Sequence, residues 1–182
     1  DNRSTSKPPK MEIIYFPRDL PGLDLSDRRT IRYRNAVGGF GNPRDEFSDY
    51  LTQMSHLRIA RSKDGINFSI DDLPAIEANQ LIEEYGVEDA RISLIDDIYY
   101  ITYVAVSRLG MATALATTKD FKTFDRHGMI MLPDNKDVTI FPEKINGKFV
   151  ALTRPMPPSF GHIHGVWIAY SEDLMTWGDH KP

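Results

Sequence analysis

The chain has 182 residues, of which 41% are hydrophobic and 10% aromatic, so it has enough apolar residues for a folded core and is not a disordered chain. Its formal net charge is −4 with acids and bases interspersed, so it lacks the basic patch of a nucleic-acid-binding protein. There is no cysteine for a disulfide or thiolate metal site, and no apolar run of the roughly 20 residues that a membrane helix needs, so we expect a cytoplasmic protein without a membrane partner.

The N-terminal segment differs from the rest of the chain. Its first ten residues, DNRSTSKPPK, are polar and lack the apolar stretch of a signal peptide. The chain also lacks an initiator methionine, which indicates a trimmed chain or a fragment. A repeat organises the sequence from residue 55 onwards, and residues 1–54 diverge from it.

Three segments share an apolar strand pattern, an alanine, a Ser or Thr, an acid and an aromatic residue. Their alanines, Ala60, Ala116 and Ala169, are spaced about 56 and 53 residues apart, which is in the range of propeller blades and other repeat arrays. The segments are RIARSKDGINF (58–68), ALATTKDFKTF (114–124) and WIAYSEDLMTW (167–177).

One complete four-stranded blade is predicted between the first two repeats. Its strands cover 87–95, 98–106, 111–118 and 124–132, because β-branched and aromatic residues alternate there without a helical period. The preceding stretch, 75–86, is predicted to be a loop or one or two helical turns. Two-residue hairpin turns are expected at Asp96-Asp97 and, about 50 residues later, at Asn146-Gly147.

The acids of the repeated turns are interpreted as scaffold. Each turn resembles the Asp-box turns of some propellers, in which the acid accepts backbone N–H bonds and the aromatic residue packs between sheets. These residues are Asp64, Asp120, Asp173, Phe68, Phe124 and Trp177.

The repeat length limits how much of a propeller this chain supplies. A propeller closes with about 4–8 four-stranded blades, whereas 182 residues provide little more than three repeats of about 53. We therefore predict a single partial propeller, with a divergent segment and first blade in 1–54, repeated blades in 55–182 and an incomplete last blade. The remaining blades would come from a longer chain or from another chain.

The motif GVEDARI (86–92) places charges at the start of an apolar strand. Strand alternation predicts that Glu88 and Asp89 point to opposite faces, while Asp89 and Arg91 share one face. The ordinary interpretation is a surface ion pair worth about 0–1 kcal/mol.

Three motifs together resemble glycoside hydrolase family 130. They are GVEDARI, NKDVTIFPEKINGKFVALTRP (135–155) and VWIAYSEDLMTWG (166–178). This family contains β-mannoside phosphorylases and a minority of β-mannosidases on an all-β, five-bladed β-propeller, of which this chain would cover roughly three blades. The chain departs from the family at Ala90, where proline is usual, and the family's later motifs, including a phosphate-holding histidine, would lie beyond Pro182.

The resemblance implies that Asp89 is the general acid, which in the phosphorylases passes its proton to the leaving oxygen through a sugar hydroxyl. Phosphate is itself the nucleophile, so the site needs cations that bind and orient it. Lys136 and Arg154 are the candidates, because equivalent ends of adjacent blades meet at one mouth of the central channel. Arg91 is expected to hold or tune Asp89.

Glu88, Arg91 and Asp137 are candidates for substrate binding, with Asp137 alternatively orienting Lys136. The HIH stretch (162–164) lacks a third ligand of suitable spacing, so no metal site is expected.

The leading hypothesis is therefore an inverting phosphorylase that cleaves β-mannosides with inorganic phosphate to give mannose 1-phosphate. Its partners would be a β-mannoside oligosaccharide and phosphate, with no cofactor, and a homo-oligomer or a missing C-terminal segment would complete the propeller. A β-mannosidase on the same fold is the first alternative; Lys136 and Arg154 argue against it, and Glu143 is the nearby acid that could activate water. A non-catalytic sugar-binding propeller fragment is the second.

Overall fold

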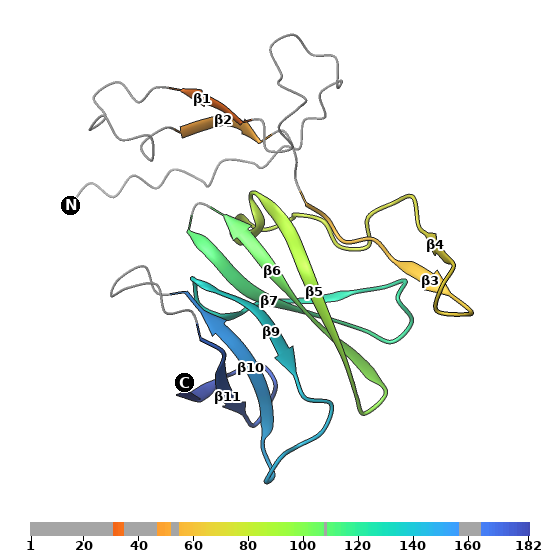
Figure 1. The fold of residues 1–182 in the computed structure, drawn as a ribbon, viewed down its shortest axis with the longest axis vertical. Coiled ribbons are helices and arrows are strands. Elements are labelled where there is room, and N and C mark those ends of the chain that lie inside the picture. The colour runs from red at the N-terminus through yellow and green to blue at the C-terminus, as the bar shows by residue number, and fades with distance from the viewer. Residues whose placement is uncertain (1–30, 35–46, 52–54, 108, 157–164) are drawn as a thin grey trace, which may run out of the picture. The chain divides into compact units, whose positions relative to one another are not determined.

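The computed structural model describes residues 31–34, 47–51, 55–107, 109–156 and 165–182, which form β-strands and turns (Figure 1). The chain divides into two compact units, residues 1–54 and 55–182. In the first unit, β1 (Ile31–Arg34) pairs antiparallel with β2 (Phe47–Leu51). Within the described residues the helical structure is the 3-10 turn η2 (Leu81–Glu83), so the fold is all-β, as predicted.

The first complete sheet contains four antiparallel strands in chain order, β5-β6-β7-β8. β5 and β6 are joined by a two-residue turn in which Asp96 and Asp97 both have positive φ, 47° and 62°, as a tight hairpin of type I′ requires. The four predicted strands and this hairpin turn are confirmed. The strands are β5 (Gly86–Ile95), β6 (Ile98–Ser107), β7 (Gly110–Thr118) and β8 (Asp125–Met131).

The second sheet repeats this meander in the order β9-β10-β11-β12. Asn146 and Gly147, with φ of 52° and 82°, form the turn at the corresponding hairpin, as the sequence predicted. Its strands are β9 (Asn135–Ile140), β10 (Phe149–Pro155), β11 (Trp167–Ser171) and β12 (Gly178–Lys181).

The repeated acidic turns join the third and fourth strands of both sheets. The same turn also joins the two strands of a separate hairpin, β3 (Ala60–Ser62) and β4 (Phe68–Ile70). In each turn one carboxylate oxygen accepts two backbone N–H bonds of 2.7–3.0 Å. These bonds hold the pKa of all three aspartates below the usual range. Ala60, Ala116 and Ala169 each stand two residues before the hydroxyl residue of their turn, so they are equivalent, as predicted.

The aromatic residues after these turns differ in their packing. Phe124 and Trp177 pack against buried clusters, as expected of scaffold residues. Phe68 is 57% exposed, so the prediction that it packs between sheets is not met within its own unit. The reason is that its hairpin pairs only β3 with β4, and Figure 1 shows it projecting away from the two complete sheets.

The part of the first sheet around the start of β5 is covered on both faces. A cluster that includes Ile95, Val138 and Ala151 fills the space between the two sheets. A second cluster, which includes Val87, Tyr103 and Ala114, packs under Ile76 and Ile82 from the segment that precedes β5. The start of β5 therefore lies between the second sheet and this covering segment.

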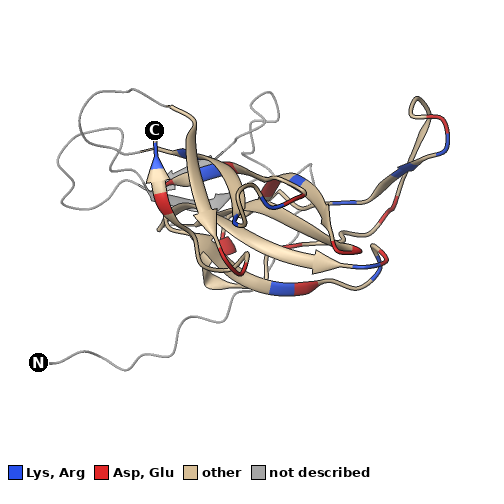
Figure 2. Cartoon of the chain, turned by 90° about the horizontal axis from the view of Figure 1, so that it is seen from below, with Lys and Arg blue, Asp and Glu red and all other residues tan. Residues whose placement is uncertain are grey.

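Acidic and basic residues are mixed along the described strands and turns. Figure 2 shows acidic and basic positions interspersed on the strands and turns. In the described ranges, no helix is long and apolar enough to cross a membrane.

Candidate active site

A β-bulge presents Asp89. Glu88 pairs with Val104 and Arg91 pairs with Thr102, so Asp89 and Ala90 lie together opposite the single residue Tyr103. Asp89 has a φ of +54°, the left-handed conformation that aspartate tolerates better than most residues. The bulge corrects the predicted alternation, because Glu88 and Arg91 lie on the face that Val104 and Thr102 share. Asp89 is the extra residue.

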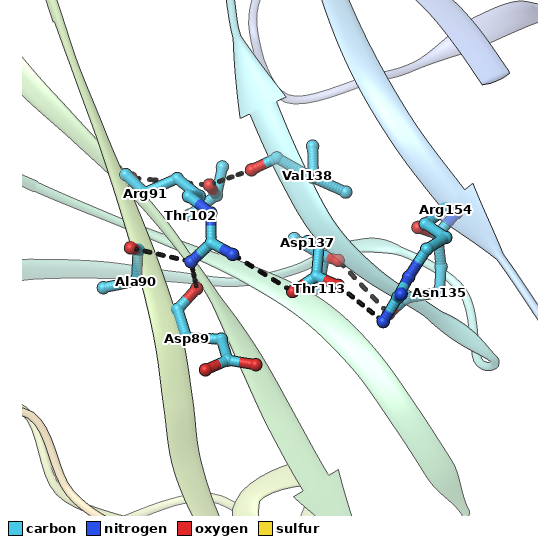
Figure 3. Close-up of polar contacts among 9 residues, drawn as sticks. All are labelled: Asp89, Ala90, Arg91, Thr102, Thr113, Asn135, Asp137, Val138 and Arg154. Carbon is cyan, nitrogen blue, oxygen red and sulfur yellow. Dashed lines mark hydrogen bonds and ion pairs between the residues drawn. The ribbon is translucent and has the colours of Figure 1, made fainter. Parts of the chain in front are cut away.

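Arg91 holds the backbone of this bulge (Figure 3). Its Nη1 donates to the carbonyl oxygens of Asp89 at 3.0 Å and Ala90 at 3.2 Å. The Asp89 carboxylate makes no hydrogen bond or ion pair with any residue that the structure describes, and it is exposed. Arg91 therefore positions Asp89 by binding the main chain of Asp89, and it leaves the Asp89 carboxylate free to act on a ligand.

The second sheet carries the same bulge at the equivalent place. Lys136 pairs with Arg154 and Thr139 pairs with Leu152, so Asp137 and Val138 lie opposite the single residue Thr153. Asp137 has a φ of +57°, almost that of Asp89.

Asp137 is enclosed by two arginines. Its Oδ1 lies 3.3 Å from Nη2 of Arg91 and its Oδ2 lies 2.6 Å from Nη2 of Arg154 (Figure 3). The side chains of Arg91 and Arg154 remain 42% and 37% exposed. Ion pairs this exposed contribute about 0–1 kcal/mol each, so stability alone does not account for the arrangement. We call Arg91, Asp137 and Arg154 the arginine bracket.

Lys136 adds a third cation beside the arginine bracket. It is directly opposite Arg154 in the β9–β10 ladder, and like charges in that position repel one another. Lys136 is half-buried and has no ion pair within the described ranges, while the buried Nε of Arg154 and Oδ1 of Asn135 have no hydrogen-bond partner. Within the group formed by Lys136 and the arginine bracket, three positive charges face the one negative charge of Asp137.

Hydroxyl groups fix the first sheet against β9. Thr102 Oγ1 donates to the carbonyl oxygen of Val138 at 2.5 Å, and Ser93 Oγ donates to that of Ile140 at 2.5 Å. These two bonds, the hydroxyl pins, join β5 and β6 of the first sheet to β9, the strand that carries Asp137. They were not predicted, because alternation alone does not indicate which hydroxyl meets a neighbouring sheet.

Glu88 lies at the entrance to β5. It is half-buried, and Ser55 Oγ donates to its Oε2 at 3.3 Å. Gly86 is required here, because it has a φ of +115° and a Cβ would lie 2.7 Å from the backbone N of Ser55. Glu88 therefore starts from a fixed backbone position.

The predicted site residues are thus partly brought together. Successive contacts link the Asp89 backbone to Arg91, Arg91 to Asp137, and Asp137 to Arg154. Lys136 lies opposite Arg154 in the ladder. Asp137 binds the two arginines, so the alternative in which it orients Lys136 has no contact to support it. Glu143 is exposed in the β9–β10 connection, at the opposite end of β9 from Lys136.

Metal binding has no candidate in the ranges that the structure describes, where no three His, Asp or Glu residues form a group suited to an ion. His162 and His164 lie outside those ranges.

The chain is similar in sequence to known proteins. The family model described as beta-1,4-mannooligosaccharide phosphorylase, that of glycoside hydrolase family 130, matches residues 36–182. The chain is 44% identical over 176 residues to a beta-1,2-mannobiose phosphorylase of Listeria innocua, covering 97% of this chain and 47% of that protein. It is 39% identical over 143 residues to a 1,2-beta-oligomannan phosphorylase of Thermoanaerobacter sp., covering 77% and 45%.

A solved structure agrees with the sequence relatives. The complex of the Listeria innocua beta-1,2-mannobiose phosphorylase with beta-1,2-mannobiose matches with a TM-score of 0.71 and 44% identity, over 91% of this chain and 44% of that one. The chain spans about half the length of the curated relatives it matches. The repeated sheets, the three motifs and these matches together mean that the chain belongs to glycoside hydrolase family 130.

Proposed function

We propose that the protein is a mannoside phosphorylase in which Asp89 is the general acid and Lys136 and Arg154 bind phosphate. The observation that carries this proposal is the excess of two positive charges at Lys136 and the arginine bracket, in contact with the backbone of an aspartate whose carboxylate is free. Phosphate carries about −1.5 to −2 charges near neutral pH, which matches that excess.

The proposed reaction is an inverting phosphorolysis. A phosphate oxygen attacks the anomeric carbon of a β-mannoside while the bond to the leaving sugar breaks, and the product is α-configured mannose 1-phosphate. The proton of Asp89 reaches the leaving oxygen by way of a sugar hydroxyl, as the family resemblance implies. Proton delivery of this kind contributes about 10²–10⁴-fold to the rate.

The substrate we propose is a β-1,2-linked mannoside. Two relatives, at 44% and 39% identity, bear names that specify this linkage, although the family model's description specifies β-1,4. Glu88, Arg91 and Asp137 are proposed to contact the sugar. The side chains of Arg91 and Asp137 are 42% and 23% exposed, so each retains surface for a hydroxyl while it holds the bracket.

The fold we propose for the whole protein is a five-bladed propeller. Each four-stranded sheet corresponds to one blade, and the β3–β4 hairpin carries the turn found between the third and fourth strands of both sheets, so it corresponds to half of a further blade. We propose that further blades complete the site, including its remaining phosphate ligands. A cytoplasmic location and a homo-oligomer stay predictions.

A β-mannosidase is the alternative within the family. It would need a carboxylate that activates water where the phosphorylase binds phosphate. Glu143, the acid considered for this role, lies at the other end of β9, and the carboxylate nearest to the cations, Asp137, is already neutralised by two arginines.

The test is an assay of the full-length native protein with β-1,2-mannobiose, with and without inorganic phosphate. We expect equimolar mannose and mannose 1-phosphate in the presence of phosphate and no cleavage in its absence. Full-rate cleavage without phosphate would identify a hydrolase. Binding of the disaccharide without any turnover would support the non-catalytic alternative.

A further inference from the structure

A buried ionic network lies beneath the Asp89 bulge. Glu83, in η2, is fully buried, and its Oε1 accepts hydrogen bonds from the Tyr103 hydroxyl at 2.9 Å and from Nη2 of Arg126. Nε of Arg126 donates to the Tyr103 hydroxyl oxygen at 3.0 Å, and the backbone N of Asn79 donates to Oε2 of Glu83 at 3.1 Å. Burying a carboxylate is costly unless it is paired in this way.

Tyr103 connects this network to the candidate site. It is the residue that stands opposite Asp89 and Ala90 in the bulge, and its side chain is 1% exposed. Ala90 packs against the same buried cluster as the Tyr103 ring. Burial and the neighbouring Glu83 carboxylate raise the pKa of the Tyr103 phenol, so the hydroxyl keeps the proton that it donates to Glu83.

The second bulge provides an internal comparison. Thr153 stands opposite Asp137 as Tyr103 stands opposite Asp89, and it is also 1% exposed. Its hydroxyl has no hydrogen-bond partner in the part of the chain that the structure describes. Among the described residues, the ionic network is therefore found under the bulge whose aspartate carboxylate is free and not under the other, so the bulge itself does not require it.

We propose that Glu83, Tyr103 and Arg126 are positioning residues for the acid, because they fix the ring against which the Asp89–Ala90 bulge is seated. Arg91 holds the bulge from the side of β9 through the two carbonyl oxygens, and the Tyr103 ring supports it from the opposite face of the sheet. Because the bulge is held from both sides, the Asp89 carboxylate is presented to the ligand in one orientation. This inference rests on the proposed role of Asp89.

The principal test is Tyr103→Phe, which removes the shared hydroxyl but leaves the ring and the pairing of Glu83 with Arg126. We expect kcat for phosphorolysis of β-1,2-mannobiose to fall about 10- to 100-fold, since small displacements of catalytic groups have effects of this order. The KM for phosphate should stay within about twofold of the unmodified value, because phosphate binding does not involve Asp89. A second variant, Arg126→Lys, keeps the charge beside Glu83 and should show the same separation of kcat from KM.

Two controls separate positioning from stability. Tyr100→Phe makes the same chemical change on the same strand, but Tyr100 packs against the other cluster, so its kcat should be unchanged. An aryl β-mannoside whose leaving group departs without protonation should be cleaved by Tyr103→Phe at nearly the unmodified rate. A merely structural role predicts equal losses on both substrates.

The outcomes distinguish the two proposals. If Asp89→Asn abolishes turnover while Tyr103→Phe and Arg126→Lys keep the unmodified kcat, the positioning inference is overturned and the proposed function stands. Equal losses on the disaccharide and the aryl mannoside also overturn the inference. If Asp89→Asn itself retains full turnover, the proposed acid is wrong and the positioning role falls with it.

Discussion

The two bulges share a backbone geometry and differ in what surrounds their aspartates. Asp89 and Asp137 are each the first residue of a two-against-one bulge, with φ of 54° and 57°, on the first strand of consecutive sheets. Asp137 is held between Arg91 and Arg154, whereas the Asp89 carboxylate has no partner among the described residues. The same repeat thus carries a free acid in the first sheet and an ion-paired acid in the second.

This difference shows how a repeat can build an asymmetric site. Asp is suited to the left-handed position in both bulges, because its short polar side chain tolerates that conformation. What separates the two is the residue supplied by the neighbouring strand. Arg154 pairs with the residue before the second bulge and binds Asp137, whereas the equivalent residue of β6, opposite Glu88, is the apolar Val104. Both sheets share the bulge, and the neighbouring side chains decide whether its aspartate is ion-paired or free.

The largest expected effect is that of Asp89→Asn. The amide keeps the shape and can still hydrogen-bond but has no transferable proton, so turnover of β-1,2-mannobiose should fall by at least about 10²-fold while sugar binding is retained. Steady-state kinetics with calorimetric titration of the disaccharide would measure both. Near-normal turnover would mean that the free carboxylate has no catalytic role.

Replacing Lys136 or Arg154 with alanine should act on phosphate. Each removes a charge-assisted contact worth about 1.5–3 kcal/mol, so the KM for phosphate should rise roughly 10- to 150-fold while affinity for the mannoside changes much less. Arg154→Lys should recover only part of the loss, because lysine cannot bind two phosphate oxygens in the planar arginine geometry. An equal rise in the KM for both substrates would contradict a phosphate-specific role.

Asp137→Asn is the matched substitution at the second bulge and should have a smaller effect than Asp89→Asn. An amide oxygen can accept from only one of the two arginines as well as the carboxylate did, a loss of about 1 kcal/mol or roughly fivefold in kcat. Turnover measured beside that of Asp89→Asn gives the comparison directly. A loss as large as that of Asp89→Asn would mean that the two bulges are functionally equivalent.

The smallest effect concerns the aspartates of the repeated turns, which have no part in the site. Their backbone hydrogen bonds lower the pKa in the folded protein, so they contribute stability above the unfolded pKa of about 3.9 and lose it as the pH falls through the folded value. Asp120→Asn should therefore lower the Tm at pH 7 by more than at pH 3, with kcat unchanged. Thermal unfolding at the two pH values would measure this, and an equal Tm shift at both would contradict it.

The sequence was sufficient for the strands and turns because their signals are local. Alternation located β5 to β8, and paired residues suited to positive φ located the turns at Asp96-Asp97 and Asn146-Gly147. The bulge was missed, since a two-against-one register depends on the partner strand. For the same reason Arg91 was expected beside the Asp89 carboxylate, although it binds the carbonyl oxygen and pairs with Asp137, 46 residues away.

Tyr103 illustrates the same limit in the core. Tyr103 lies on β6 and is buried. Its hydroxyl partners come from η2 and β8, which lie 20 residues before it and 23 after it in the chain. No pattern within β6 indicates that these segments meet there, so the ionic network required the folded structure.

The hydroxyl pins have a mechanical consequence for the two sheets. Apolar side chains between sheets resist separation but resist sliding less, because dispersion contacts have little directional preference. A hydrogen bond loses strength steeply when its angle is distorted, so Thr102 and Ser93 oppose shear of β9 along the first sheet. These two directional hydrogen bonds therefore limit how far the distance between Asp89 and the cations can vary. Thr102→Val would remove one of them and widen that range of distances while the apolar core stays closed.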